Sequence, residues 1–225
     1  MIRLYDYPLS GNCFKVRQML AWLGLQWAPV AVDFHPGKAH KAPEFLGKIN
    51  PRGQLPVLDD DGFLLRDAQA ILVYLASRYD VEQRWYPQYA RLRGEIALWL
   101  ATADEITATA SAARLHDAFG YVLDVRAARA GAHALFRMMD DHLAERASSG
   151  RRWLVGEGDA HAPTIADLAC FPYVALAPEG GIDLDSYPAL RRWVRDVRHV
   201  PGFIGMPGIF VPLTEAAAAS SATVA

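Results

Sequence analysis

The chain has 225 residues, of which 52% are apolar and 21% are charged, an ordinary balance for a folded protein. Its 23 Lys and Arg against 25 Asp and Glu leave a net charge of −2, which supplies no broad attraction for a polyanion, so we expect neither nucleic acid nor a membrane as partner. We expect a cytoplasmic protein with free thiols, because the chain has only two cysteines and shows no secretory signal. It also has no apolar run of about 18 residues that would span a membrane.

The first eighty residues predict alternating strands and helices. Residues 2–7 alternate apolar and polar side chains like a half-buried strand, and a helical pattern then runs from Cys13 to a stop at Gly24. The elements that follow are a strand at 28–32, a short helix near 40–46, a hairpin turning at 60–62 and a helix from about residue 70. This β-α-β-α-β-β-α order predicts a small mixed sheet with helices on its faces, which we assign to residues 1–80.

Beyond residue 87 the strand signals end and helical spacing takes over. The pattern predicts long helices at 89–116 and 122–147, and later helices at 164–174 and 188–197. Thr164 followed by Asp167 has the spacing of a capping box. We therefore expect an all-α domain over residues 87–225. The seven histidines show no metal-ligand spacing, so no metal site is expected.

The turn between the first strand and the first helix has the most chemical content. Ser10 stands just before the helix, where backbone N–H groups and the positive end of the dipole stabilise an anion. Its hydroxyl is placed to donate to a thiolate or another anion. The alternative is that Ser10 or Asn12 only caps the helix.

Cys13 follows Ser10 at the spacing of a C-x-x-C motif whose first cysteine has become serine. In a βαβ context that spacing suggests thiol–disulfide chemistry. The attacking thiol of such a motif is the first one, however, and Cys13 stands one turn inside the helix. We favour a buried small hydrophobe at this position.

Three other short segments have a binding interpretation beside an ordinary one. The peptide bond between Leu55 and Pro56 lies at the start of a strand. In the cis form it would leave the Leu55 backbone free to pair with a bound peptide. The alternative is the trans form, which is the commoner state. Asp67 begins a helix, where it either accepts from a ligand ammonium or serves as an N-cap. His40 and Lys41 either hold a carboxylate or form a solvated pair.

Together these features resemble the cytosolic glutathione transferases, most closely bacterial members of the theta- or phi-like serine type. The resemblance covers nearly the whole chain and rests on the serine turn and on residues 50–58, 67–71, 163–167 and 192–193. It implies a thioredoxin-like N-terminal domain followed by an all-helical domain, a homodimer and a role in detoxification. It also implies glutathione as a co-substrate, with no tightly bound cofactor.

The resemblance assigns a role to each matching residue. Ser10 matches the catalytic serine that holds the glutathione thiolate. The other glutathione contacts fall on His40 and Lys41 for the glycine carboxylate, on Gln54, Leu55 and the cis-proline Pro56 for the cysteinyl backbone, and on Asp67 and Ala68 for the γ-glutamyl group. The second substrate would be a small apolar electrophile in an apolar cleft between the domains, lined by Leu9 and by His116 or Phe119.

Ala68 departs from the family pattern, which has serine at this position. Alanine keeps the backbone N–H but lacks the hydroxyl, so one hydrogen bond to the γ-glutamyl carboxylate is lost. Such a bond contributes roughly 1.5–3 kcal/mol, or about tenfold to hundredfold in affinity. Two alternatives to a transferase therefore stay open: a non-catalytic binding protein with a weakened glutathione site, and a glutathione-dependent thiol oxidoreductase that uses Cys13.

Overall fold

The structure, a computed structural model, describes residues 1–156 and 162–212. Its N-terminal part contains one mixed sheet with the strand order β2-β1-β3-β4. The strands are β1 (Ile2–Asp6), β2 (Trp27–Ala31), β3 (Val57–Asp60) and β4 (Phe63–Arg66). β1 pairs in parallel with β2 and antiparallel with β3, and β3 pairs antiparallel with β4. β2 is an edge strand, as its Pro29 predicts, because proline cannot donate to a ladder.

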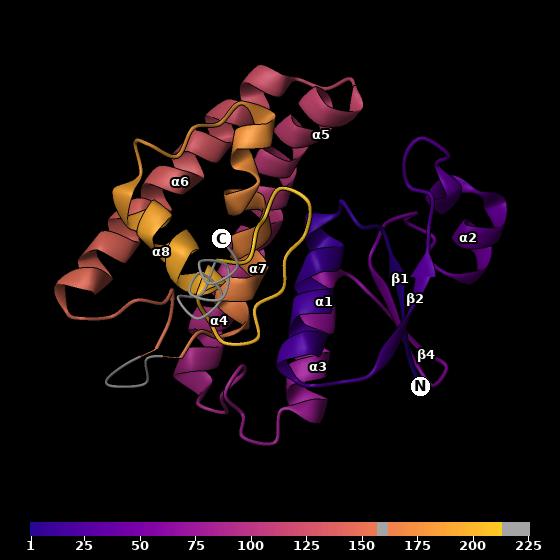
Figure 1. Ribbon diagram of the computed structural model, residues 1–225, viewed down its shortest axis with the longest axis horizontal. Coiled ribbons are helices and arrows are strands. Elements are labelled where there is room, and N and C mark those ends of the chain that lie inside the picture. Colours follow the sequence, from indigo (N-terminus) through magenta and orange to yellow (C-terminus); the bar gives the residue numbers. More distant parts are fainter. Residues whose placement is uncertain (157–161, 213–225) are drawn as a thin grey trace, which may run out of the picture.

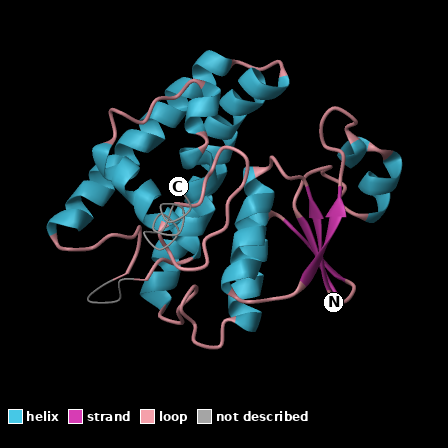
Figure 2. Ribbon diagram, viewed as in Figure 1, coloured by secondary structure: helices cyan, strands magenta, loops and turns pink. Residues whose placement is uncertain are grey.

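Helices cover both faces of this sheet (Figures 1 and 2). α1 (Gly11–Trp22) and α3 (Ala68–Tyr79) pack against each other on the face toward the helical domain. α2 (Pro43–Lys48), preceded by a 3₁₀ turn at Ala39–Lys41, lies on the opposite side. Two crossover connections, one through α1 from β1 to β2 and one through α2 from β2 to β3, link the strands. The turn after β1, the segment before β3 and the start of α3 lie at one edge of the domain.

The rest of the described chain is helical. Its helices are α4 (Ala90–Ile106), α5 (Ala112–Phe119), α6 (Val125–Ser148), α7 (Ile165–Ala175) and α8 (Pro188–Arg198), with a 3₁₀ turn at Ala177–Gly180. The single helix predicted over 89–116 is interrupted by a π-helical turn at Thr107–Ser111. Such turns are rare and frequently lie at functional sites.

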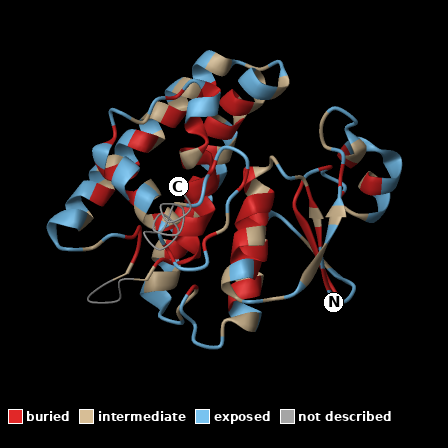
Figure 3. Cartoon of the chain, viewed as in Figure 1, coloured by how far each residue is buried: buried red, intermediate tan, exposed pale blue. Residues whose placement is uncertain are grey.

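The centre of the helical domain is α7, nearly all of which is buried (Figure 3). Thr164 caps it, and the Asp167 carboxylate completes the predicted capping box by accepting from the Thr164 N–H at 3.0 Å. Asp167 also accepts from the Leu154 N–H at 2.9 Å and from the Trp193 indole N–H at 2.8 Å. A buried carboxylate is stabilised by such donors, so Asp167 fixes α7 against α8 and against the segment before it.

One apolar core joins the two domains. Phe14 of α1 contacts Phe171 of α7 and Phe203, with ring centroids 6.2 and 5.9 Å apart. The predicted fold class, a thioredoxin-like unit followed by a helical domain, is confirmed. The division between residues 80 and 87 remains our proposal, which the end of α3 at Tyr79 and the start of α4 at Ala90 support. The helical domain that we place over 87–225 includes residues 157–161 and 213–225, which lie outside the described residues.

Candidate active site

A cavity of about 600 Å³ opens where the sheet edge of the first domain faces α4, α5 and α7. It is lined by every site residue named from the sequence except His116, namely by Leu9, Ser10, His40, Lys41, Gln54, Leu55, Pro56, Asp67, Ala68 and Phe119. The residues implied by the resemblance are therefore close together in space, although they span more than a hundred positions of the chain.

Ser10 is the N-cap of α1. Its backbone is extended, and its Oγ accepts a hydrogen bond from the Cys13 N–H at 3.2 Å. The capping interpretation of Ser10 is therefore realised, and Asn12 is not the cap. Capping uses a lone pair of the hydroxyl and leaves its hydrogen free, so a capping serine is still able to donate to a ligand in the cavity.

The Cys13 thiol does not line the cavity. Its side chain is fully buried, and burial, the largest cause, raises the pKa of the thiol to about 12. Reactive cysteines need a lowered pKa and an accessible sulfur. Cys13 has neither, in accord with a buried small hydrophobe, and its environment gives no support to the oxidoreductase hypothesis.

A basic corner lies at the end of the cavity formed by the 3₁₀ turn. His40 is buried and stacks on Phe34, with ring centroids 4.1 Å apart, and its pKa is lowered by burial first and then by Lys41 and Lys38. The Lys41 ammonium donates to the Gly53 carbonyl at 2.8 Å. Gly53 has a φ of +57°, and a Cβ there would meet the His40 carbonyl at 2.7 Å, so only glycine fits. The corner thus holds a neutral imidazole between two cationic side chains.

The segment before β3 presents backbone to the cavity. The peptide bond between Leu55 and Pro56 is cis. The ladder between β1 and β3 begins at Val57, so Leu55 lies outside it. Asn50 fixes the approach to this segment, since its Nδ2 donates to the Gln54 carbonyl at 2.9 Å. The Leu55 backbone therefore lies at the cavity edge, where a peptide could pair with it.

Two carboxylates, those of Asp67 and Asp104, line the cavity near the start of α3. Asp67 is the N-cap of α3, accepts from the Ala70 N–H at 2.9 Å and has a φ of 83°, which is unusual for a residue with a Cβ. Asp104, from the end of α4, accepts a hydrogen bond from Gln69. Its pKa is raised by burial first and then by repulsion from Asp67. A cation between the two carboxylates would relieve this repulsion. The Ala68 side chain lies beside them and is 3% exposed.

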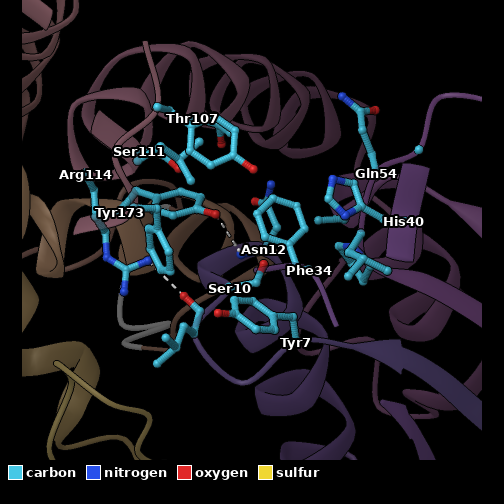
Figure 4. A pocket seen from close by; sticks show the side chains of 18 of the residues that line it. Tyr7, Ser10, Asn12, Phe34, His40, Gln54, Thr107, Ser111, Arg114 and Tyr173 are labelled. Atoms are coloured by element: carbon cyan, nitrogen blue, oxygen red, sulfur yellow. Dashed lines mark hydrogen bonds between the residues drawn. The ribbon is translucent and has the colours of Figure 1, made fainter. Parts of the chain in front are cut away.

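The helical domain forms the opposite wall, with more polar groups than the apolar cleft expected from the sequence. Figure 4 shows Arg114, Ser111 and Tyr173 on one side of Ser10 and Asn12, and His40 and Gln54 on the other. Phe119 and Leu115 supply the apolar part of this wall.

Of the two alternatives expected in the electrophile pocket, Phe119 lines the cavity and His116 does not. Its Nδ1 is 2.8 Å from a carboxylate oxygen of Asp117, and the ring is part of that pair. The helical spacing explains the difference, because Leu115 and Phe119, four residues apart, share one face of α5 and His116 points elsewhere.

Sequence reasoning missed most of the residues that the helical domain contributes. Asp104, Thr107, Ser111, Arg114 and Tyr173 all line the cavity. Each lies within a helical pattern, where a polar side chain on an otherwise apolar face was the available signal. The π-helical turn places Thr107 and Ser111 toward the cavity, and no spacing rule indicates such a turn.

Comparison with known proteins agrees with this geometry. The family model described as "Glutathione S-transferase, N-terminal domain" matches residues 4–84. A maleylacetoacetate isomerase of Rhizobium meliloti (strain 1021) is 34% identical over 196 residues, which cover 83% of this chain and 86% of that protein.

Solved structures extend the similarity. A glutathione S-transferase from Xanthobacter autotrophicus Py2 superposes with a TM-score of 0.79 at 31% identity, covering 92% of this chain and 98% of that one. Ure2p in complex with glutathione gives a TM-score of 0.75 at 25% identity, covering 89% and 91% of the two chains.

The fold and the cavity define a protein with a thioredoxin-like unit, a helical domain and a polar site between them. The chain belongs to the glutathione S-transferase family. The predicted enzyme class, a glutathione S-transferase, is confirmed at the level of that family.

Across the described residues, no three His, Cys, Asp or Glu side chains gather in a way that could hold a metal ion. Within residues 1–156 and 162–212, no helix has the length and apolar character needed to cross a membrane.

Proposed function

We propose that this protein binds glutathione in the cavity between its domains and transfers it to a small electrophile, with Ser10 stabilising the thiolate. The observation that carries the proposal is the Ser10 hydroxyl, which caps α1 and opens into a cavity whose other surfaces suit the rest of a γ-glutamyl tripeptide. Relatives support it: the Xanthobacter autotrophicus neighbour is named a glutathione S-transferase, and Ure2p was solved with glutathione bound.

The ends of glutathione differ in charge, and so do the ends of the cavity. The glycine carboxylate would lie against Lys38, His40 and Lys41. The γ-glutamyl carboxylate would take the free N–H groups at the start of α3, and its ammonium would lie between Asp67 and Asp104. The cysteinyl backbone would pair with Leu55 in strand fashion. In this orientation the thiol reaches Ser10.

The chemistry required of the protein is the ionisation of a thiol. A free thiol has a pKa of about 8.5 and is only a few per cent thiolate at neutral pH. A hydroxyl donor and the positive end of α1 both favour the anion and lower that pKa. The thiolate then forms a bond to the electrophilic atom. In a substitution, a leaving group departs with its electron pair. In an addition to a double bond, the other end of that bond takes a proton from solvent, to which the thiol proton was released.

The second substrate would lie on the wall formed by Leu9, Leu115 and Phe119, within reach of Ser10. We propose an apolar body for it because these side chains offer mainly van der Waals contact. Incubation with glutathione and a panel of small electrophiles, followed by the mass of the products, tests the transferase proposal. A protein that binds glutathione and forms no conjugate with any of them would be the non-catalytic alternative.

Asp104→Asn is expected to weaken glutathione binding about fivefold near neutral pH, the value of one partly exposed ion pair of about 1 kcal/mol. The attraction to the ammonium requires an ionised carboxylate, and the pKa of Asp104 is raised by burial and by Asp67. Wild-type affinity should therefore fall as the pH drops through this raised pKa. Calorimetric titration between about pH 4 and 7 measures both effects.

The variant should lose the part of the pH dependence that belongs to Asp104, because an amide does not titrate in this range. Asp141→Asn is the matched control, since Asp141 lies exposed on α6 and does not line the cavity. Equal affinity and an equal pH profile for wild type and Asp104→Asn would show that Asp104 does not contact the ammonium.

We also propose a homodimer, as the family resemblance implies, and a role in the removal of reactive electrophiles. The family supports both.

A further inference from the structure

A second hydroxyl lies beside Ser10 at the start of α1. Tyr173, on α7 of the helical domain, is 6% exposed and lines the cavity. Its hydroxyl oxygen accepts a hydrogen bond from the Asn12 N–H at 3.2 Å (Figure 4). A Cβ on Gly11 would lie 2.7 Å from the tyrosine ring, so the glycine allows the ring to approach the helix this closely.

The two hydroxyls are bound in the same way. The Cys13 N–H donates to Ser10, and the preceding N–H, that of Asn12, donates to Tyr173. The N–H groups of the first turn have no partner within a helix. Here two successive N–H groups donate to hydroxyl oxygens instead. Each hydroxyl acts as an acceptor there and keeps its own hydrogen to donate. A hydroxyl that accepts one hydrogen bond becomes a stronger donor of another.

The surroundings of Tyr173 keep it a donor at neutral pH. Burial, the largest cause, raises the pKa of the phenol, and the hydrogen bond from the Asn12 N–H offsets this only in part. The Lys15 ammonium lies 5.6 Å from the ring centroid, against the face of the ring. The phenol is thus protonated, and Ser10 and Ser111 line the same cavity as Tyr173.

We infer that the Tyr173 hydroxyl donates a second hydrogen bond to the glutathione thiolate, so that one catalytic hydroxyl comes from each domain. The inference rests on the proposed function, in which the thiol of bound glutathione reaches Ser10. Tyr173 would then lower the pKa of the thiol and make the ionisation depend on contact between α7 and α1. The thiol proton leaves to solvent, and both hydroxyls remain protonated.

The test compares wild type, Tyr173→Phe, Ser10→Ala and the double variant. The readout is the pKa of the bound thiol, followed by the ultraviolet absorbance of the thiolate. Loss of one hydrogen bond to a charged group predicts an increase of about one pKa unit for Tyr173→Phe and a value near that of free glutathione for the double variant. Tyr187→Phe is the matched control, since Tyr187 bonds to His133 and does not line the cavity.

The kinetics separate donation from a merely structural role. With Tyr173→Phe, kcat/KM for conjugation should fall about tenfold near pH 6.5 and approach the wild-type value at high pH, where the thiol ionises without help. Gly11→Ala is a second variant that keeps the hydroxyl and displaces the ring, and it should shift the pH profile in the same direction.

The possible failures are distinguishable. A wild-type protein that does not bind glutathione, or binds it with an unshifted thiol pKa, refutes the proposed function. A wild-type protein with a lowered thiol pKa that Tyr173→Phe leaves unchanged overturns the role of Tyr173 alone. A double variant whose bound thiol has the same pKa as in Ser10→Ala would likewise overturn the role of Tyr173.

Discussion

Ser10→Ala is expected to lower kcat/KM for glutathione conjugation by about tenfold to hundredfold near neutral pH. The lost interaction is a hydrogen bond to a charged sulfur, worth roughly 1.5–3 kcal/mol. The bound thiol should titrate about one to two pH units higher than in the wild type. Glutathione affinity should change less, because the other proposed contacts of the tripeptide are with His40, Leu55 and Asp67, which also line the cavity. Steady-state rates across a pH series measure the effect.

The same substitution removes the cap of α1, which costs about 1 kcal/mol of unfolding free energy. Ser10→Thr separates the two roles, since threonine retains both the cap and the hydroxyl and should retain most of the activity. Ser148→Ala, at the exposed end of α6, is a control for the loss of a serine hydroxyl outside the cavity. A Ser10→Ala variant with wild-type kcat/KM at every pH would exclude Ser10 from the reaction.

Ala68→Ser is expected to raise glutathione affinity by about tenfold to hundredfold. Ala68 is the first residue of α3, its side chain lines the cavity, and a hydroxyl there would donate to the γ-glutamyl carboxylate beside the free N–H groups of the helix. The gain corresponds to roughly 1.5–3 kcal/mol. Calorimetry on both proteins gives the ratio of the two dissociation constants.

Ala70→Ser is the matched control, since Ala70 lies two residues further along α3 and does not line the cavity. A large gain with Ala68→Ser would favour a site that is weakened in the wild type, as the binding-protein alternative requires. Affinities within about twofold for wild type and Ala68→Ser would show that the hydroxyl is not needed, and the departure from the family pattern would then say nothing about function.

The elements of the fold follow from periodicity, whereas the site depends on residues that only tertiary structure brings together. The alternation in β1, the helical spacing of α1 and the capping box of Thr164 are local, so the sequence predicts them. Tyr173 and Asn12 are 161 positions apart and meet only because α7 packs on α1. No local sequence pattern predicts that contact.

The gaps in these predictions have the same origin. His116 or Phe119 was expected in the electrophile pocket; Phe119 lines the cavity, whereas His116 lies beside Asp117. Asp104 has no local signal in the sequence, because a single acid in a helix is usually solvated, and here it lines the cavity together with Asp67. The resemblance supplied the residues of the first domain that we propose as glutathione contacts, and it supplied none of the polar groups with which the second domain lines the cavity.

The pH titration of glutathione bound to the wild-type protein tests the central claim most directly. The thiolate absorbance of the complex, minus that of the free protein and the free ligand, gives the pKa of the bound thiol. We predict binding at millimolar glutathione and a thiol pKa at least one unit below the free value of about 8.5. A thiol that titrates at its free value in the complex, or a protein that binds no glutathione at that concentration, would contradict the account.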